Sequence, residues 1–164
     1  YDVGPERTDE LFAAFKALAD RKKRITGRDL SALVEARAAR KETSAPEWRL
    51  DSFVVNSGNR MKATAQVALV KGNRRVEEAA IGNGPVYASF RAVEKIIRRK
   101  FILEDYRIEA VTEHRDALGE VLVKISDGEK SWRGRGVSTD IIEGSILALL
   151  VAVNKMLESK HPHA

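Results

Sequence analysis

Two stretches of this chain carry nearly the same pattern of charged strand, small-residue turn and apolar helix. Residues 81–89 read IGNGPVYAS, and residues 136–145 read GVSTDIIEGS. The helices that follow also end alike, with AVEKI at 92–96 and AVNKM at 152–156. Such self-similarity predicts a duplicated strand-turn-helix unit. Because each unit contains a helix N-terminus with free backbone N–H groups, the pair predicts a symmetric site for a small anion.

Length and composition limit the class of protein. A chain of 164 residues suits one domain with a sizeable core, and because it begins with Tyr1 we expect a fragment of a longer protein. The absence of cysteine excludes disulfides and thiol catalysis and fits a reducing, cytoplasmic location. The longest apolar run, 146–153, is far shorter than the roughly 20 residues of a membrane span, so no membrane partner is expected.

The charge pattern argues against nucleic-acid binding. The net charge of +5 comes from 29 basic and 24 acidic residues that are interleaved along the chain. Two basic runs, 21–24 and 98–100, each close a predicted helix, where cations complement the helix dipole. A basic RNA-binding module stays open as an alternative, but it would need exposed aromatic residues or a clustered basic face.

The hydrophobic periodicity changes once along the chain. Residues 1–36 predict a small helical hairpin, with helices from Thr8 and from Thr26, and 37–47 predict a flexible linker that contains Pro46. Residues 48–160 then predict six strands and two helices. The strands are expected at 48–55, 63–70, 76–81, 103–112, 118–125 and 130–136, and the helices at 85–100 and 140–157. The predicted fold class is therefore α+β, with two pseudo-symmetric βββα units (about 48–100 and 101–160) packed together.

Four sequence blocks resemble the C-terminal regulatory domain of 2-isopropylmalate synthase. They are GNGPV at 82–86, LEDY at 103–106, DALGEV at 116–121 and GVSTDIIE at 136–143. The segment FKALADRKK at 15–23 is similar to the helical linker subdomain that precedes that domain. The resemblance thus covers nearly the whole chain.

The resemblance implies a feedback sensor rather than a catalyst. Such domains bind L-leucine as an effector, form a homodimer, and act on their own N-terminal catalytic barrel. The barrel would use a divalent metal and acetyl-CoA, so no cofactor, metal site or catalytic residue is expected in this fragment. A structural dimerisation domain without a ligand remains an alternative.

The resemblance also implies an effector site near the dimer interface. The resemblance implies that the turn at 82–85 allows close backbone approach and that 116–119 form a facing wall. It implies that Thr139 and Asp140 lie near the ligand's polar end. An aliphatic pocket would be lined by Leu103, Tyr106, Ala110 and Ile141. The implied site residues are Gly82, Asn83, Gly84, Pro85, Val86, Tyr87, Leu103, Tyr106, Ala110, Asp116, Ala117, Leu118, Gly119, Thr139, Asp140 and Ile141. The alternative is that Leu103, Tyr106 and Ile141 belong to the core, and that the two glycines serve only turn and cap.

Two departures from the family pattern bear on the ligand. Tyr87 stands where relatives usually have Asp, so the carboxylate that would hold the effector's ammonium is missing, and Glu113 or Asp116 is the alternative counter-charge. Glu113, His114 and Arg115 replace a Gly-rich turn. The nearest alternative in the family is the isoleucine-sensing domain of citramalate synthase. The STDI sequence at 138–141, in place of His-Pro-Asp-Gln, favours the leucine branch.

Overall fold

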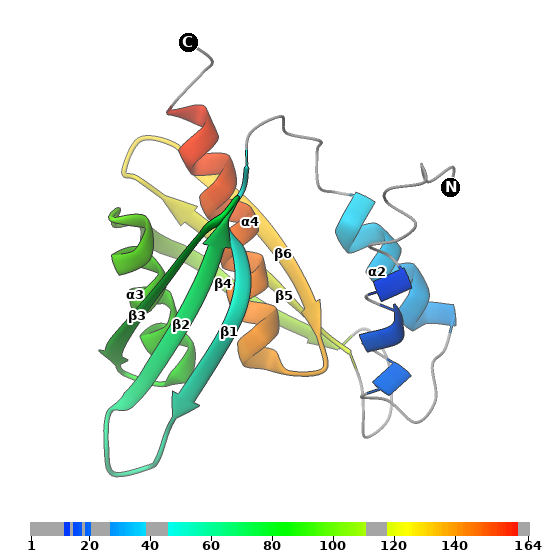
Figure 1. Cartoon of the computed structure of the whole chain (residues 1–164), viewed down its shortest axis with the longest axis horizontal. Helices are drawn as coiled ribbons and strands as arrows, with labels where there is room; N and C mark the ends of the chain where they lie inside the picture. Colours follow the sequence, from blue (N-terminus) through cyan, green and yellow to red (C-terminus); the bar gives the residue numbers. More distant parts are fainter. Residues whose placement is uncertain are drawn as a thin grey trace.

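The chain contains two successive βββα units, as the sequence predicted. The computed structural model describes residues 12–13, 15–17, 19–20, 27–38, 46–110 and 118–160. The first unit consists of β1 (Arg49–Asn56), β2 (Ala63–Lys71), β3 (Arg74–Gly82) and α3 (Pro85–Ile97). The second consists of β4 (Ile102–Ala110), β5 (Gly119–Ser126), β6 (Ser131–Ser138) and α4 (Ile141–Ser159). Figure 1 shows both units and, beside β6, helix α2 (Gly27–Ala38).

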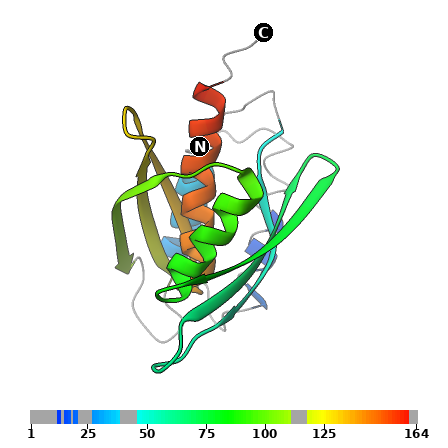
Figure 2. The same ribbon diagram turned by 90° about the vertical axis from the view of Figure 1, so that its left-hand side faces the viewer.

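Each unit forms its own antiparallel sheet, with strand orders β1-β2-β3 and β4-β5-β6. Figure 2 shows α3 and α4 lying between the two sheets. Along β5, residues facing the helices are buried and alternate with half-buried ones, which is the period of two expected for a sheet covered on one side. Val67 of β2, Val123 of β5 and Val153 of α4 belong to one hydrophobic cluster, so the two units share a single core.

The helix boundaries differ from the predictions at two places. Helix α3 ends at Ile97 rather than near Lys100, because Arg98 adopts the left-handed conformation (φ 53°) and its N–H bonds back to the carbonyls of Glu94 and Lys95. Helix α2 continues to Ala38, so the first residues of the expected linker are helical. The described residues between 12 and 20 are helical as predicted, while Thr8, Thr26 and most of the expected linker lie outside the described residues.

In the C-terminal half of each of α3 and α4, one side chain forms hydrogen bonds with the residue that precedes the first strand of the other unit. Asn154 of α4 accepts a hydrogen bond from the Trp48 N–H and donates one to the Trp48 carbonyl, both at 2.9 Å and both buried. Glu94 of α3 accepts a hydrogen bond from the Phe101 N–H at 3.1 Å. Trp48 precedes β1 and Phe101 precedes β4, so these crossed caps tie the two units together.

The lysine that follows each cap residue also has an equivalent role. Lys95 donates to the Ala79 carbonyl of β3 at 2.7 Å, and Lys155 donates to the Arg133 carbonyl of β6 at 2.8 Å. Each lysine therefore satisfies a backbone acceptor on the third strand of its own unit. The sequence echo between 92–96 and 152–156 thus reflects a repeated set of contacts.

Helix α4 packs very close to β6 because that strand carries two glycines. A Cβ atom at Gly134 would overlap the backbone oxygen of Ala148, and one at Gly136 would overlap the backbone oxygen of Gly144. The C-terminal end of α4 is linked to the β5–β6 turn through Lys160, which pairs with Asp127. Hydrogen bonds from the Lys130 N–H, the Lys160 ammonium and the Glu129 N–H hold the pKa of the Asp127 carboxyl well below its usual range.

We predict that Asn154→Ala lowers the free energy of unfolding by about 1–3 kcal/mol for each Trp48 group left without its partner. Asn56→Ala, at an exposed strand end, is the matched control and should change it by less than about 0.5 kcal/mol. Urea denaturation followed by circular dichroism measures both. Equal midpoints for the two variants would contradict a structural role for the crossed caps.

Candidate effector site

Helices α3 and α4 begin at the same end of the molecule (Figures 1 and 2). Strand β3 ends at Gly82, and Gly84 caps α3 with φ 103° and ψ 159°. Pro85 occupies the first turn, and in the described structure no side chain caps this helix start. The N-terminal end of α3 therefore presents its positive dipole end without a side-chain acceptor.

The two glycines of this turn have different roles. Gly82 is buried, and a Cβ atom there would lie 2.5 Å from the Ala88 nitrogen, so its missing side chain allows α3 to approach β3. A Cβ atom at Gly84 would meet nothing within 4 Å. Gly84 is needed for a backbone conformation that is essentially restricted to glycine, and the space beside it is open.

The start of α4 is not equivalent to that of α3. The Asp140 carboxylate accepts hydrogen bonds from the Ile142 N–H at 2.7 Å and the Glu143 N–H at 3.1 Å. The Asp140 N–H in turn donates to Ser138 Oγ at 3.0 Å, and Ser138 donates to the Glu143 carboxylate. The expected symmetric anion site is therefore wrong for α4, because a carboxylate already binds its free N–H groups.

Strand β4 places part of the implied pocket on the face toward the helices. Tyr106 pairs with Val123 and Ala110 pairs with Gly119, and those positions of β5 face the helices. Ser145 donates to the Ile141 carbonyl at 2.6 Å, so it accepts the hydrogen bond from the Tyr106 hydroxyl at 2.8 Å. Tyr106 thus links β4 to the first turns of α4.

The structure brings some further site residues to this end and separates others. Gly119 lies against Ile141, since a Cβ atom on Gly119 would be 2.5 Å from Ile141 Cδ1. Leu118 is fully buried. Leu103 pairs with Ile125, at the opposite end of β4 from Ala110. Thr139 is half-buried beside Asp140, whereas Asp116 and Ala117 lie outside the described residues.

One half-exposed residue of β4 was missed by the sequence analysis. Ile108 lies between Tyr106 and Ala110 on the same face, pairs with Val121, and is 49% exposed. Within the described part of the chain, the helix backbones approach β1, β2, β3, β5 and β6 but not β4. The alternation of a strand was the available signal, because every second residue after Tyr106 lies on its face.

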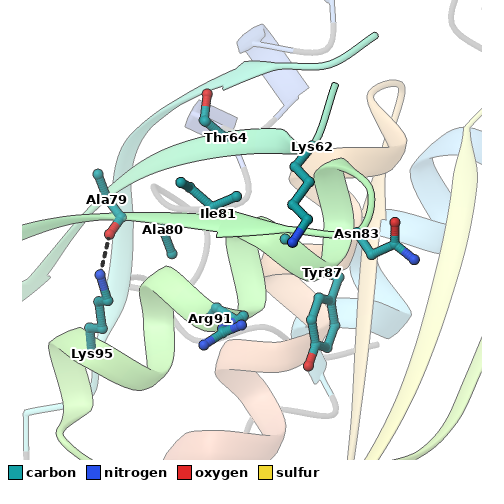
Figure 3. A pocket seen from close by; sticks show the side chains of 10 residues that line it. Lys62, Thr64, Ala79, Ala80, Ile81, Asn83, Tyr87, Arg91 and Lys95 are labelled. Atoms are coloured by element: carbon teal, nitrogen blue, oxygen red, sulfur yellow. Dashed lines mark hydrogen bonds between the residues drawn. The ribbon is translucent and has the colours of Figure 1, made fainter. Parts of the chain in front are cut away.

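A separate open groove of about 960 Å³ runs along the edge strand β3 and α3. Figure 3 shows its lining. Tyr87 and Asn83, both implied site residues, line this groove rather than the face of β4. The charged residues in its lining are all basic: Lys62, Arg91 and Lys95. The spacing of Tyr87, Arg91 and Lys95 by four residues was a signal that they share one face of a helix.

Two other classes of site are absent from the described residues. No group of three or more His, Asp or Glu side chains in this part of the chain is placed to hold a metal ion. None of its helices is long and apolar enough to cross a membrane.

Comparison with known proteins identifies similar sequences. A family model described as the LeuA allosteric (dimerisation) domain matches residues 24–157. The chain is 47% identical over 158 residues to a 2-isopropylmalate synthase of Ruminiclostridium cellulolyticum, covering 96% of this chain and 30% of that relative. It is 45% identical over 159 residues to the 2-isopropylmalate synthase of Carboxydothermus hydrogenoformans, with the same coverage of 96% and 30%. The chain thus spans about 30% of the length of the curated relatives it matches.

We predict that Gly84→Ala lowers the free energy of unfolding by about 1–3 kcal/mol, because alanine cannot adopt the Gly84 backbone conformation without strain. Gly58→Ala is the control, since Gly58 has no positive φ and a Cβ atom there meets only the flexible Met61 side chain at 3.4 Å. Chemical denaturation of both variants measures the difference. A Gly84 variant as stable as the control would show that this turn does not require glycine.

Proposed function

The chain belongs to the LeuA allosteric (dimerisation) domain family, and from this membership we propose that it is the leucine-binding regulatory domain of a 2-isopropylmalate synthase. The observation that carries the proposal is the family match, which extends over residues 24–157 and includes both βββα units. The similar proteins are named 2-isopropylmalate synthase, and the chain covers only about 30% of their length. A catalytic barrel with a divalent metal and acetyl-CoA would belong to the remainder of the parent protein.

We propose an effector site formed by the start of α3 and the inner face of β4. An amino acid has a carboxylate, an ammonium and a side chain, and each needs a different environment. The first turn of α3 offers backbone N–H groups and a positive dipole end to the carboxylate. The side chains of Tyr106, Ile108 and Ala110 offer an apolar surface to an aliphatic side chain.

The ammonium group would be held from the second unit. Asp140 is exposed, and two backbone N–H groups hold its carboxylate in place at the start of α4. Thr139 adds a hydroxyl beside it. Asp116 is the further candidate for this counter-charge, since Tyr87 replaces the family's acidic residue and lines the groove along β3. Leucine binding therefore draws on both units of the chain.

Feedback inhibition would follow from coupling between domains. An effector shifts the state of the parent enzyme only by binding two arrangements with different affinity. Helix α4 connects the proposed effector site to the start of β1. Its first turns carry Asp140 and Ser145. Near its C-terminal end, Asn154 binds Trp48, where the preceding segment enters the domain. We propose that this helix carries the signal toward the linker and the catalytic barrel.

We predict that leucine binds more tightly than isoleucine by about 10- to 200-fold, the range for a methylene-scale mismatch in an apolar pocket. Leucine branches one carbon further from the backbone, so its methyls reach the face of β4 while the Cβ branch of isoleucine crowds the pocket entrance. Isothermal titration calorimetry with each amino acid measures the ratio. Gly84→Asp is the binding-deficient control, because it places a side chain and a negative charge where the ligand carboxylate would lie.

Three outcomes of this titration are informative. Tighter binding of isoleucine would favour the citramalate synthase branch. No heat with any branched-chain amino acid would favour a structural dimerisation domain. Equal leucine affinity for Gly84→Asp and the unmodified protein would place the site away from the α3 start.

We also predict a homodimer, in agreement with the dimerisation named in the family description. An isologous pair would cover apolar side chains that one copy leaves exposed, such as Ile81 and Ile102. Multi-angle light scattering should give a mass near twice the monomer mass of 18.2 kDa at micromolar concentration. A monomer mass under these conditions is the outcome that contradicts the expectation.

A further inference from the structure

We propose that the open groove along β3 and α3 binds a small ligand that carries phosphate groups. The groove has a volume of about 960 Å³, which is the size of pockets that hold small molecules. Its lining contains Lys62, Arg91 and Lys95 and no acidic residue. This site goes beyond the proposed leucine site and does not depend on it, because it uses other side chains and a different ligand chemistry.

Two of the three cations in the groove have no counter-charge in the described part of the chain. Neither Lys62 nor Arg91 forms an ion pair or a side-chain hydrogen bond with another described residue. Figure 3 shows them on opposite sides of the end of β3, with Lys62 from the segment before β2 and Arg91 from α3. Like charges that share one groove repel each other, and a bound anion removes that repulsion.

The edge of β3 adds backbone donors to the same groove. Strand β3 lies at the edge of its sheet, and the Ala79 carbonyl accepts a hydrogen bond from Lys95 at 2.7 Å. A carbonyl that α3 reaches points away from β2, and in an antiparallel pair the N–H of the same residue points the same way. Ile81 is the next residue of this kind along the strand. Because Lys95 already occupies the Ala79 carbonyl, the edge offers mainly N–H donors to a ligand.

The same lysine argues against a peptide strand as the occupant of the groove. A strand added to the edge of β3 would need the Ala79 carbonyl as an acceptor, and Lys95 occupies it. Lys155 occupies the Arg133 carbonyl of β6 in the same way. A lysine over an edge strand is a known means of preventing strand addition. An anion needs only donors, so it fits the groove as it stands.

The groove and the proposed dimer contact at Ile81 lie on different faces of the first sheet. Ala80 and Gly82 are buried on the helix side, so the side chain of Ile81 between them points to the outer face. Figure 3 shows the Ile81 side chain directed away from α3, which carries Arg91 and Tyr87. A second copy that covers the Ile81 side chain therefore contacts the face opposite to Arg91.

Phosphate groups match the donors of this groove. A guanidinium such as that of Arg91 binds two phosphate oxygens through parallel N–H···O bonds, and an ammonium such as that of Lys62 adds a point charge. Tyr87 is 49% exposed in the lining and offers its ring and hydroxyl to the remainder of the ligand. With two cations that lack a partner, the groove suits a ligand that has two neighbouring phosphate groups.

The test is isothermal titration calorimetry of the chain with inorganic pyrophosphate, at low ionic strength and without other polyvalent anions. Arg91→Gln should weaken pyrophosphate binding by about tenfold, since it removes charge-assisted hydrogen bonds. Arg99→Gln is the matched control, because Arg99 is an exposed arginine just beyond α3 and lies outside the groove lining. The control removes the same charge and should leave the dissociation constant unchanged.

Each other result would overturn the inference or add to it. Absence of saturable binding at millimolar pyrophosphate would overturn it. An equal loss in Arg99→Gln would show attraction by net charge alone, and tighter binding of citrate than of pyrophosphate would overturn the phosphate class. Lys62→Gln is the second variant, and a folded protein with unchanged affinity would place the anion elsewhere. A leucine titration of the unmodified protein tests the proposed function separately, so either site is able to fail without the other.

Discussion

The structure depends on the crossed caps between helix ends and strand starts. Asn154 satisfies the backbone N–H and carbonyl of Trp48 in a buried place, and Glu94 satisfies the N–H of Phe101. Unpaired backbone groups at the buried position would cost free energy comparable to lost hydrogen bonds, so this arrangement fixes where each unit begins. Since each cap comes from the other unit's helix, neither unit keeps these contacts alone. The two sheets are thereby held on opposite sides of one helix pair.

The duplicated units differ at their helix starts: a side chain caps α4, and no side chain caps α3. The carboxylate of Asp140 caps the start of α4, and Ser138 and Glu143 complete the hydrogen-bond network there. Helix α3 begins at Gly84 with open space beside the backbone. Under the proposed function, an anionic group would bind at the start of α3 and would be repelled by Asp140 at the start of α4. One chain with two similar halves thus offers one open site of this kind in its described part.

The cationic groove along β3 shows that neighbouring residues of a motif can serve different surfaces. Tyr87 follows Val86 directly, and successive helix residues point about 100° apart. Val86 packs against the core, while Tyr87 lines the groove with Arg91 and Lys95. The side chain of Tyr87 therefore shapes this groove rather than the apolar face of β4. Residues adjacent in a sequence block need not belong to one binding site.

The sequence by itself determined the order of the elements, the duplication and the family, because these depend on local periodicity, turn residues and short motifs. Only the tertiary structure decided that Ile108 is left uncovered and that Gly82 is needed for α3 to approach β3. Those facts depend on strand register and on which helix covers which strand. Both are set by contacts between residues far apart in the sequence, such as the one between Trp48 and Asn154, and no local pattern encodes them.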